Sequence, residues 1–234
     1  MTTLEALAAQ PYPGRFIILR RNTQGHDLVI YGITGRSPPS QERKIVHYAN
    51  EQMMAVESTD PITTGKGNKD LLLYDCLSYT PQGIVVGNGI QTRSLRRQLP
   101  AVSSPIDALL RGVRDYDYEN DSLQTPRISG VVIGNQAALS VIRGDGIKRS
   151  ERMYLEFWLV DGIGRMISTY QGAMDPTPWE GDPKKVDLMY DTAQQAAEDV
   201  YAALAPERRV AVVAFQRKYG QDVVHIINKK GQGS

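Results

Sequence analysis

Short runs of β-branched and aromatic residues dominate the hydrophobic pattern of the chain. Most of them are bounded by Gly, Asn, Asp or Pro, which is typical of strands in an antiparallel sheet. Two pairs of runs are joined by polar turns, NTQGHD after the first run and NQAA in the middle of the chain. The runs predicted to be strands are 16–20, 28–33, 83–88, 128–134, 138–143, 153–160, 165–170, 209–216 and 222–227.

Two segments show helical periodicity instead. In 186–204 apolar residues recur at spacings of three and four, at Met189, Ala193, Ala196, Val200 and Leu204. A second helix is predicted near 104–114, with Ser104 as N-cap and Pro105 at the first helical position. Clustered strands separated by a few helices favour an α+β fold with mostly antiparallel sheets.

Length and composition bound the class of protein. The 234 residues show no repeat, linker or composition break, so we expect a single domain over 1–234. Its 27 Lys and Arg balance 26 Asp and Glu, which disfavours nucleic acid or an anionic membrane as partner. No run of about 18 apolar residues could span a bilayer. The start is interpreted as a short helix ended by Pro11 rather than a secretory signal.

Cysteine and histidine usage narrows the compartment and the chemistry. One cysteine, Cys76, excludes an internal disulfide framework and a multi-cysteine zinc site. Three scattered histidines offer no close pair of metal ligands. We therefore expect a soluble, cytoplasmic protein with no metal and no cofactor.

The segment ITGRSPPSQERK (33–44) follows a predicted strand and is rich in groups that hold anions. A guanidinium grips a phosphate or carboxylate through two parallel hydrogen bonds, and serine hydroxyls can complete the cradle. Arg36, Ser37 and Arg43 are therefore candidate ligands. A solvated basic turn is the alternative interpretation.

Residues 63–79, TTGKGNKDLLLYDCLSY, hold a further cation and the lone thiol. The spacing G-x-x-x-x-G-K-[ST] is absent around Lys66, which disfavours an NTP-hydrolysing phosphate loop. Tyr74 and Cys76 are two apart in a possible strand and would face the same side. Without a visible His partner, Cys76 is interpreted as a small buried hydrophobe rather than a nucleophile.

A polar turn follows the run at 83–88. Asn88 and Gly89 signal a turn, and the hydrogen-bonding side chains of Gln91 and Thr92 come directly after it. Such a turn could bind the edge of a purine or a ribose, or it could be an ordinary hairpin.

The acidic run RDYDYEND (114–121) admits several readings. It lacks the glycine and glutamate positions of an EF-hand, and a magnesium site on Asp115 and Asp117 would have no phosphate loop to share it with. Glu119 is a candidate base and Arg127 a candidate anion ligand. For Arg127 a buried ion pair is an equal alternative.

Taken together and in order, these segments resemble the archaeal-type IMP cyclohydrolase family and its bacterial relatives. The resemblance spans most of 11–183, after a ten-residue extension and before a C-terminal helix and strands at 184–234. The matching pieces are PYPGR (11–15), ITGRS (33–37) with Arg43, LLLYDC (71–76), VVGNGIQT (85–92), DYEND (117–121), TPRISGV (125–131), ALSVIR (138–143) and TYQG…PTPWEGDP (169–183).

The resemblance implies a fold and an activity. That family is similar to the N-terminal-nucleophile hydrolases, a four-layer αββα sandwich of two mostly antiparallel sheets. The implied reaction is ring closure of the formamido-imidazole-carboxamide ribonucleotide (FAICAR) to IMP with loss of water, and the reverse hydrolysis, at the end of purine synthesis. The alternatives are a purine-nucleotide-binding protein without turnover and an amidohydrolase of the N-terminal-nucleophile type. The internal Cys76 and the extension before Pro11 depart from the latter, which needs a reactive first residue.

The resemblance also implies which residues act. Arg43, Tyr74 and Glu119 match the positions of the family's active centre. Glu119 is then expected to transfer protons, Arg43 to stabilise charge, and Tyr74 to hydrogen-bond or protonate the formyl oxygen. The implied partner is a small purine ribonucleotide, and a homo-oligomer is an open possibility. The candidate substrate-binding residues are Arg36, Ser37, Lys66, Asn88, Gln91, Thr92 and Arg127.

Overall fold

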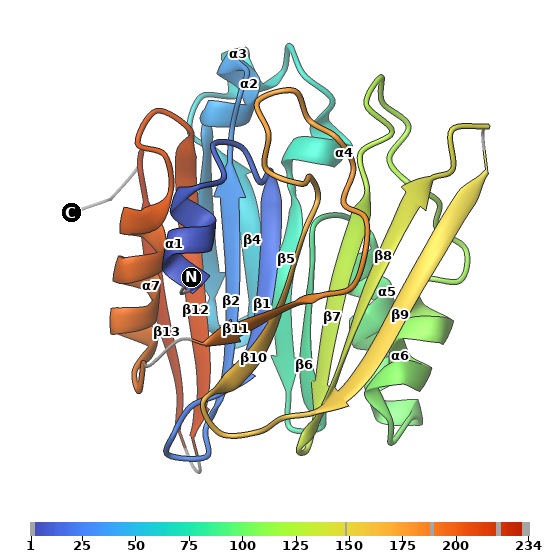
Figure 1. Ribbon diagram of the computed structural model, residues 1–234, viewed down its shortest axis with the longest axis vertical. Helices are drawn as coiled ribbons and strands as arrows, with labels where there is room; N and C mark the ends of the chain where they lie inside the picture. Colours follow the sequence, from blue (N-terminus) through green and yellow to red (C-terminus); the bar gives the residue numbers. More distant parts are fainter. Residues whose placement is uncertain (1–2, 148, 188–189, 219–220, 231–234) are drawn as a thin grey trace.

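Two antiparallel sheets pack face to face in the computed structural model, which describes residues 3–147, 149–187, 190–218 and 221–230 (Figure 1). The six-stranded sheet has the order β11-β10-β1-β2-β12-β13, with β1 (Arg15–Arg21), β2 (Asp27–Thr34), β10 (Ile163–Ser168), β11 (Lys184–Asp187), β12 (Arg209–Lys218) and β13 (Gln221–Asn228). The seven-stranded sheet runs in chain order, with β3 (Arg43–Tyr48), β4 (Met53–Ser58), β5 (Tyr74–Thr80), β6 (Gly83–Gly87), β7 (Arg127–Ile133), β8 (Gln136–Gly144) and β9 (Ser150–Trp158).

Helices cover the outer face of each sheet. Helix α7 (Ala193–Ala203), with α1 (Thr3–Ala8) beside it, packs on the six-stranded sheet through Ala196, Val200 and Leu7. Helices α5 (Gln91–Gln98) and α6 (Pro105–Gly112) pack on the other sheet through Leu95 and Leu109. A third apolar cluster fills the space between the sheets. The predicted α+β class and the four-layer αββα arrangement are confirmed, while the likeness to N-terminal-nucleophile hydrolases stays a prediction.

Most of the predicted elements are present, with corrected boundaries. Helix α7 begins at Ala193, where the Thr192 side chain accepts a hydrogen bond from the Gln195 amide; Met189 lies outside the described residues. Ser104 is the residue before α6, but its hydroxyl donates to Glu156 rather than capping the helix. NQAA belongs mostly to β8, because that strand already starts at Gln136.

Other segments differ from the prediction in kind. The turn at Asn88 leads into helix α5, so the hairpin alternative is wrong. Strands β3, β4 and β11 have no counterpart among the predicted strands: charged residues make up much of β3 and β11, and β4 has only four apolar residues before Glu57 and Ser58. The remaining short helices are α2 (Pro38–Gln41), η1 (Ala49–Glu51), α3 (Pro61–Thr64), α4 (Lys69–Leu72) and η2 (Leu99–Ala101).

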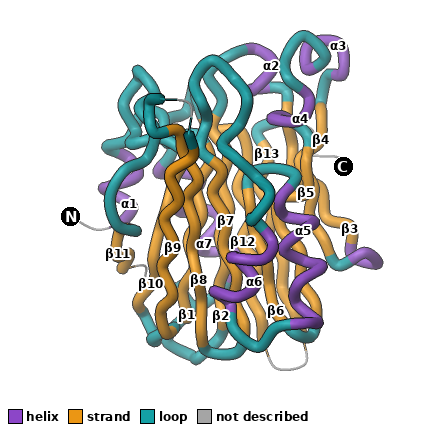
Figure 2. Tube along the Cα trace, turned by 90° about the vertical axis from the view of Figure 1, so that its right-hand side faces the viewer, coloured by secondary structure: helices purple, strands orange, loops and turns teal. Residues whose placement is uncertain are grey.

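The antiparallel order brings every second strand start to one end of the sandwich. Strands β3, β5 and β7 therefore all begin at the same end of the sandwich, near the loops that carry α2, α3 and α4 (Figures 1 and 2). Tight turns join the strands at the opposite end. The first residues of β1, β3, β5 and β7 are Arg15, Arg43, Tyr74 and Arg127. This end of the sandwich thus gathers ionisable side chains that are far apart in sequence.

Candidate active site

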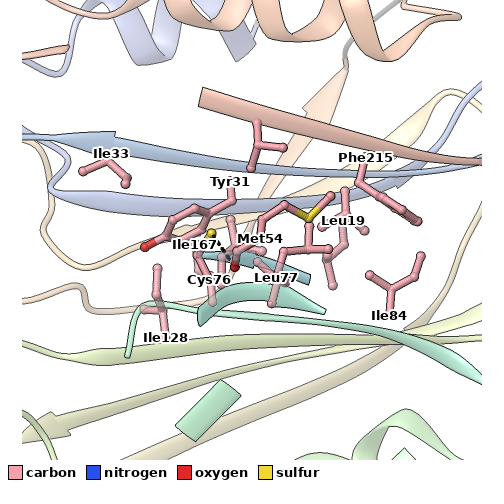
Figure 3. Packing of buried hydrophobic residues seen from close by; sticks show 14 of the residues in the cluster. Leu19, Tyr31, Ile33, Met54, Cys76, Leu77, Ile84, Ile128, Ile167 and Phe215 are labelled. Carbon is pink, nitrogen blue, oxygen red and sulfur yellow. Dashed lines mark hydrogen bonds between the residues drawn. The ribbon is translucent and has the colours of Figure 1, made fainter. Parts of the chain in front are cut away.

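A pair of tyrosines joins the two sheets at the end of the sandwich where β1, β3, β5 and β7 begin. The hydroxyl oxygens of Tyr31, on β2, and Tyr74, on β5, lie 2.7 Å apart and are buried. Figure 3 shows the Tyr31 oxygen on the Ile33 side of the central cluster, away from Phe215. Burial raises the pKa of Tyr74, so its hydroxyl keeps its proton at neutral pH and can donate it in a hydrogen bond.

Arg43 is fixed beside this pair by the backbone. It is 2% exposed, its Nε donates to the Ser40 carbonyl at 2.8 Å, and its Nη2 donates to the Thr34 carbonyl at 3.3 Å. Burial lowers the pKa of Arg43, against the opposing effect of Tyr74. The predicted residues Arg43 and Tyr74 therefore lie in one buried neighbourhood.

Arg15 is a second buried arginine of this neighbourhood. It is 7% exposed and starts β1 on the inner face of the sheet, two residues before Ile17 of the central cluster. Among the described residues, neither Nε nor Nη2 of Arg15 has a hydrogen-bond partner. A buried guanidinium with unsatisfied N–H groups is costly unless another group accepts them.

Gly14 sets the position of Arg15. Its φ of +74° lies in the left-handed region, and a Cβ there would come within 2.1 Å of Thr169 Oγ1 and 2.6 Å of the Tyr170 ring. Thr169 then holds the Arg15 backbone from both sides, since its Oγ1 accepts from the Arg15 N–H and its own N–H donates to the Arg15 carbonyl. The glycine of PYPGR is thus required for the approach of β1 to residues 169–170.

Glu119 forms the acidic part of the site. It is 3% exposed, and its Oε1 accepts a hydrogen bond of 2.7 Å from Arg127 Nη1. Burial raises the pKa of Glu119 to about 7, although the charges of Arg127 and Arg15 oppose the rise. A carboxyl group that titrates near neutral pH is suited to accepting and returning protons.

The predicted polar turn at Asn88–Thr92 holds this ion pair through hydrogen bonds. Gln91 Oε1 accepts from Arg127 Nη1 at 3.1 Å, and Gln91 Nε2 donates to Asn88 Oδ1 at 3.0 Å. Asn88 also donates to the Pro126 carbonyl, and Thr92 donates to the Gly89 carbonyl. The three predicted binding residues Asn88, Gln91 and Thr92 are buried and make these contacts within the protein. Their contact with a substrate stays a prediction.

Two stacked tyrosines close the neighbourhood near β10. The rings of Tyr12 and Tyr170 lie with centroids 5.5 Å apart and an interplanar angle of 24°. The Arg36 guanidinium lies 5.7 Å from the Tyr12 ring centroid. The Tyr170 hydroxyl is 2.7 Å from Thr125 Oγ1, in the loop that follows Glu119. The stack therefore links the PYPGR segment to the loop of the acidic run.

The other predicted anion ligands are on the surface of the same end. Arg36, Ser37 and Lys66 are exposed in the loops around α2 and α3. Ser37 is held in a turn in which its N–H donates to Ser40 Oγ at 2.9 Å. These groups are accessible to a ligand from solvent, and their role stays a prediction.

The acids of RDYDYEND are not equivalent. Asp115 and Asp117 are exposed, whereas Glu119 is buried. The ring beside the ion pair belongs to Tyr116, whose centroid lies 5.5 Å from the Arg127 guanidinium carbon. No group of three or more potential metal ligands occurs within the described ranges of the chain.

The lone thiol is far from a reactive state. Cys76 is fully buried on the same side of β5 as Tyr74, as predicted, and its Sγ donates to the Met54 carbonyl at 3.5 Å. Burial raises the pKa of Cys76, so the thiolate is scarce at neutral pH.

A cavity of about 490 Å³ lies at the opposite end of the sandwich, among the hairpin turns. Its two arginines are already paired, Arg21 with Asp27 at 2.7 Å and Arg217 with Asp222 at 3.1 Å. A reaction that needs a proton acceptor, a hydroxyl donor and an unpaired positive charge fits the end that carries Glu119 better than it fits this cavity.

Among the helices of the described residues, none has the length and apolar character of a membrane span.

Two residues of this site escape the sequence interpretation. The sequence pattern does not identify Arg15 or Tyr31, because Arg15 directly precedes one ordinary strand run and Tyr31 lies in another; they come together only when β1 and β2 meet β3 and β5. For Arg15 a signal exists: a charged residue follows a glycine at the start of an apolar strand. Tyr31 has no such signal.

Comparison with known proteins shows to which family the chain belongs. A family model described as IMP cyclohydrolase-like protein matches residues 12–222, which include every candidate residue. An IMP cyclohydrolase of Methanothrix thermoacetophila is 31% identical over 152 residues, covering 64% of this chain and 71% of that protein. That of Methanocella arvoryzae is 30% identical over 168 residues (70% and 76%), and that of Methanocaldococcus jannaschii is 25% identical over 187 residues (80% and 84%). The chain thus belongs to the IMP cyclohydrolase-like family.

Proposed function

We propose that this protein is an IMP cyclohydrolase, which closes FAICAR to IMP with loss of water and catalyses the reverse hydrolysis. The single observation that carries the proposal is a buried carboxyl with a pKa of about 7, Glu119, whose charge interacts with that of Arg15, while Arg15 in turn interacts with Tyr31 and Tyr74. Ring closure needs a proton acceptor and hydroxyl or cationic donors together.

The first step makes the new ring bond. The carboxamide nitrogen attacks the formyl carbon, and the electron pair of the formyl C=O bond moves onto its oxygen. Glu119, in its ionised form, accepts the proton that the nitrogen loses, and Tyr74 first donates a hydrogen bond to the oxygen and then transfers its proton to it, which leaves a Tyr74 phenolate. The product of this step is a ring with a hydroxyl group on the former formyl carbon.

The second step removes water. The carbon–oxygen bond breaks, the hydroxyl leaves as water with a proton, and the proton of the former formamide nitrogen passes to the Tyr74 phenolate, which restores Tyr74 and gives IMP. Glu119 has taken up a proton in the first step and can return it to the leaving hydroxyl. A carboxyl with a pKa of about 7 suits both directions of transfer.

Positive charge around the site favours a phosphorylated substrate. Arg36, Ser37 and Lys66 are proposed to hold the 5′-phosphate, because they are exposed at the same end as the buried groups. Arg127 is proposed to act mainly through Glu119, since its Nη1 is engaged by Glu119 and Gln91. The proposed setting is the cytoplasm, with a soluble purine ribonucleotide as the partner and without a resident metal or cofactor.

The direct test is ultraviolet absorbance during incubation of the purified protein with FAICAR. Formation of IMP, confirmed by chromatography, is the expected result. Binding of FAICAR without IMP formation would instead favour a nucleotide-binding protein without turnover. Release of ammonia from an amide substrate would favour an amidohydrolase.

A further inference from the structure

Arg15 differs from the other cations of the site in how its guanidinium is used. It is buried, yet within the described residues Nε and Nη2 find no acceptor. Arg43 has both Nε and Nη2 on backbone carbonyls, and Arg127 is paired with Glu119. Arg15 thus has donors in place that the protein itself does not use.

The groups around Arg15 indicate which part of a substrate its free N–H groups could contact. The hydroxyls that interact with it electrostatically belong to Tyr74, Tyr170, Tyr31 and Tyr12. It also interacts with Glu119, so it is near both the proposed proton acceptor and the proposed hydroxyl donor. A phosphate dianion would be better served by the exposed cations at the rim, where less desolvation is needed.

We propose that Arg15 is a catalytic residue that donates from Nε and Nη2 to the formyl oxygen as negative charge develops on it. The inference rests on the proposed function. In the ring-closing step this oxygen receives the electron pair of the C=O bond before it is protonated. Prearranged donors at such an oxygen stabilise the transition state more than the ground state. This gives to Arg15 the charge-stabilising role that the family resemblance suggests for Arg43.

Binding tests the contact without requiring turnover. The formyl carbon becomes C2 of the purine, where IMP carries only hydrogen and xanthosine 5′-monophosphate carries an oxygen. Wild-type protein is expected to bind xanthosine 5′-monophosphate about ten- to a hundredfold more tightly than IMP, measured by calorimetry, because a charged donor meets that oxygen. In Arg15→Gln the ratio is expected to fall to about one.

Kinetics supply the second readout. Arg15→Gln is expected to lower kcat for FAICAR about a hundred- to a thousandfold with little change in KM. In Arg15→Ala, added guanidinium ion should restore part of the rate. The matched control is Arg20→Gln: Arg20 is 1% exposed and also lacks side-chain hydrogen bonds in the described part, but it is five residues further along β1 and faces the helix side. It should keep kcat.

The results of these experiments distinguish failure of the proposed role of Arg15 from failure of the proposed function. An unchanged affinity ratio and kcat in a folded Arg15→Gln variant overturns the proposal, and a rise in KM alone moves Arg15 to the phosphate. If the wild-type protein binds both nucleotides but does not cyclise FAICAR, the proposed function fails and the affinity ratio still judges Arg15. If the wild-type protein binds neither nucleotide, both proposals are wrong.

Discussion

Tyr31 and Tyr74 place their hydroxyl oxygens 2.7 Å apart across the interface of the two sheets. Each comes from a different sheet, so this contact fixes the relative position of the sheets at the end where the ionisable groups gather. The residues are 43 apart in sequence. A small slip of one sheet over the other would separate the two halves of the proposed site.

Removing the Tyr31 hydroxyl should impair the position of Tyr74. Tyr31→Phe leaves the buried Tyr74 hydroxyl without its partner, so we expect a loss of about 1–3 kcal/mol of unfolding free energy. We also expect kcat for FAICAR to fall about ten- to a hundredfold with KM nearly unchanged, because misplacement affects the reacting groups. Tyr79→Phe is the control: Tyr79 lies on the same strand as Tyr74, and its hydroxyl is hydrogen-bonded to His47 of β3. Equal kinetic losses in both variants would contradict the assignment.

The pH profile of the reaction should carry the signature of Glu119. Its ionised form is the proposed base, and burial raises its pKa to about 7, so kcat/KM for cyclisation should rise as pH increases through about 7. Glu119→Gln should lose this limb and at least about a hundredfold in rate. A limb near 7 that persists in Glu119→Gln would assign it to another group.

Arg127 should tune that same limb. Its positive charge favours ionised Glu119, so Arg127→Met is expected to raise the pKa of Glu119 and shift the limb to higher pH. Arg127→Lys keeps the charge and should shift it less. Because Arg127→Met leaves a buried carboxyl unpaired, it should also cost about 3–5 kcal/mol in urea unfolding. A limb at the same pH in all three proteins would separate Arg127 from proton transfer.

A single methyl group should disturb the ion pair without changing any ionisable residue. In Gly89→Ala the new Cβ would lie 2.8 Å from Arg127 Nη1 and 2.9 Å from Glu119 Oε1. Those atoms are far ends of side chains, so we expect them to shift while the fold persists, with kcat reduced about tenfold or more. Circular dichroism and thermal unfolding check the fold. Wild-type kcat would show that the pair tolerates displacement.

The chain pattern predicts the sheets better than it predicts the site. Strands such as β2 and β8 are visible because β-branched runs end at turn residues, whereas β3 and β4 alternate buried and half-buried positions with charges and polar groups among them. Residue type makes Glu119 one candidate base, and only the family resemblance places it at the active centre, since an acidic loop by itself does not distinguish the buried carboxyl from exposed ones. Its raised pKa depends on long-range packing that the local sequence does not encode.

The end of the sandwich with the tight turns should tolerate inserted residues better than the end that carries Glu119. The turns near 22–26, 81–82 and 134–135 join strands whose opposite ends carry the proposed chemistry. Exposed turns accept inserted residues more readily than packed segments. Fluorophores, affinity tags or immobilisation linkers attached at these turns would therefore lie at the end of the molecule remote from Glu119. The fold is for this reason a convenient scaffold for sensors of its own ligand.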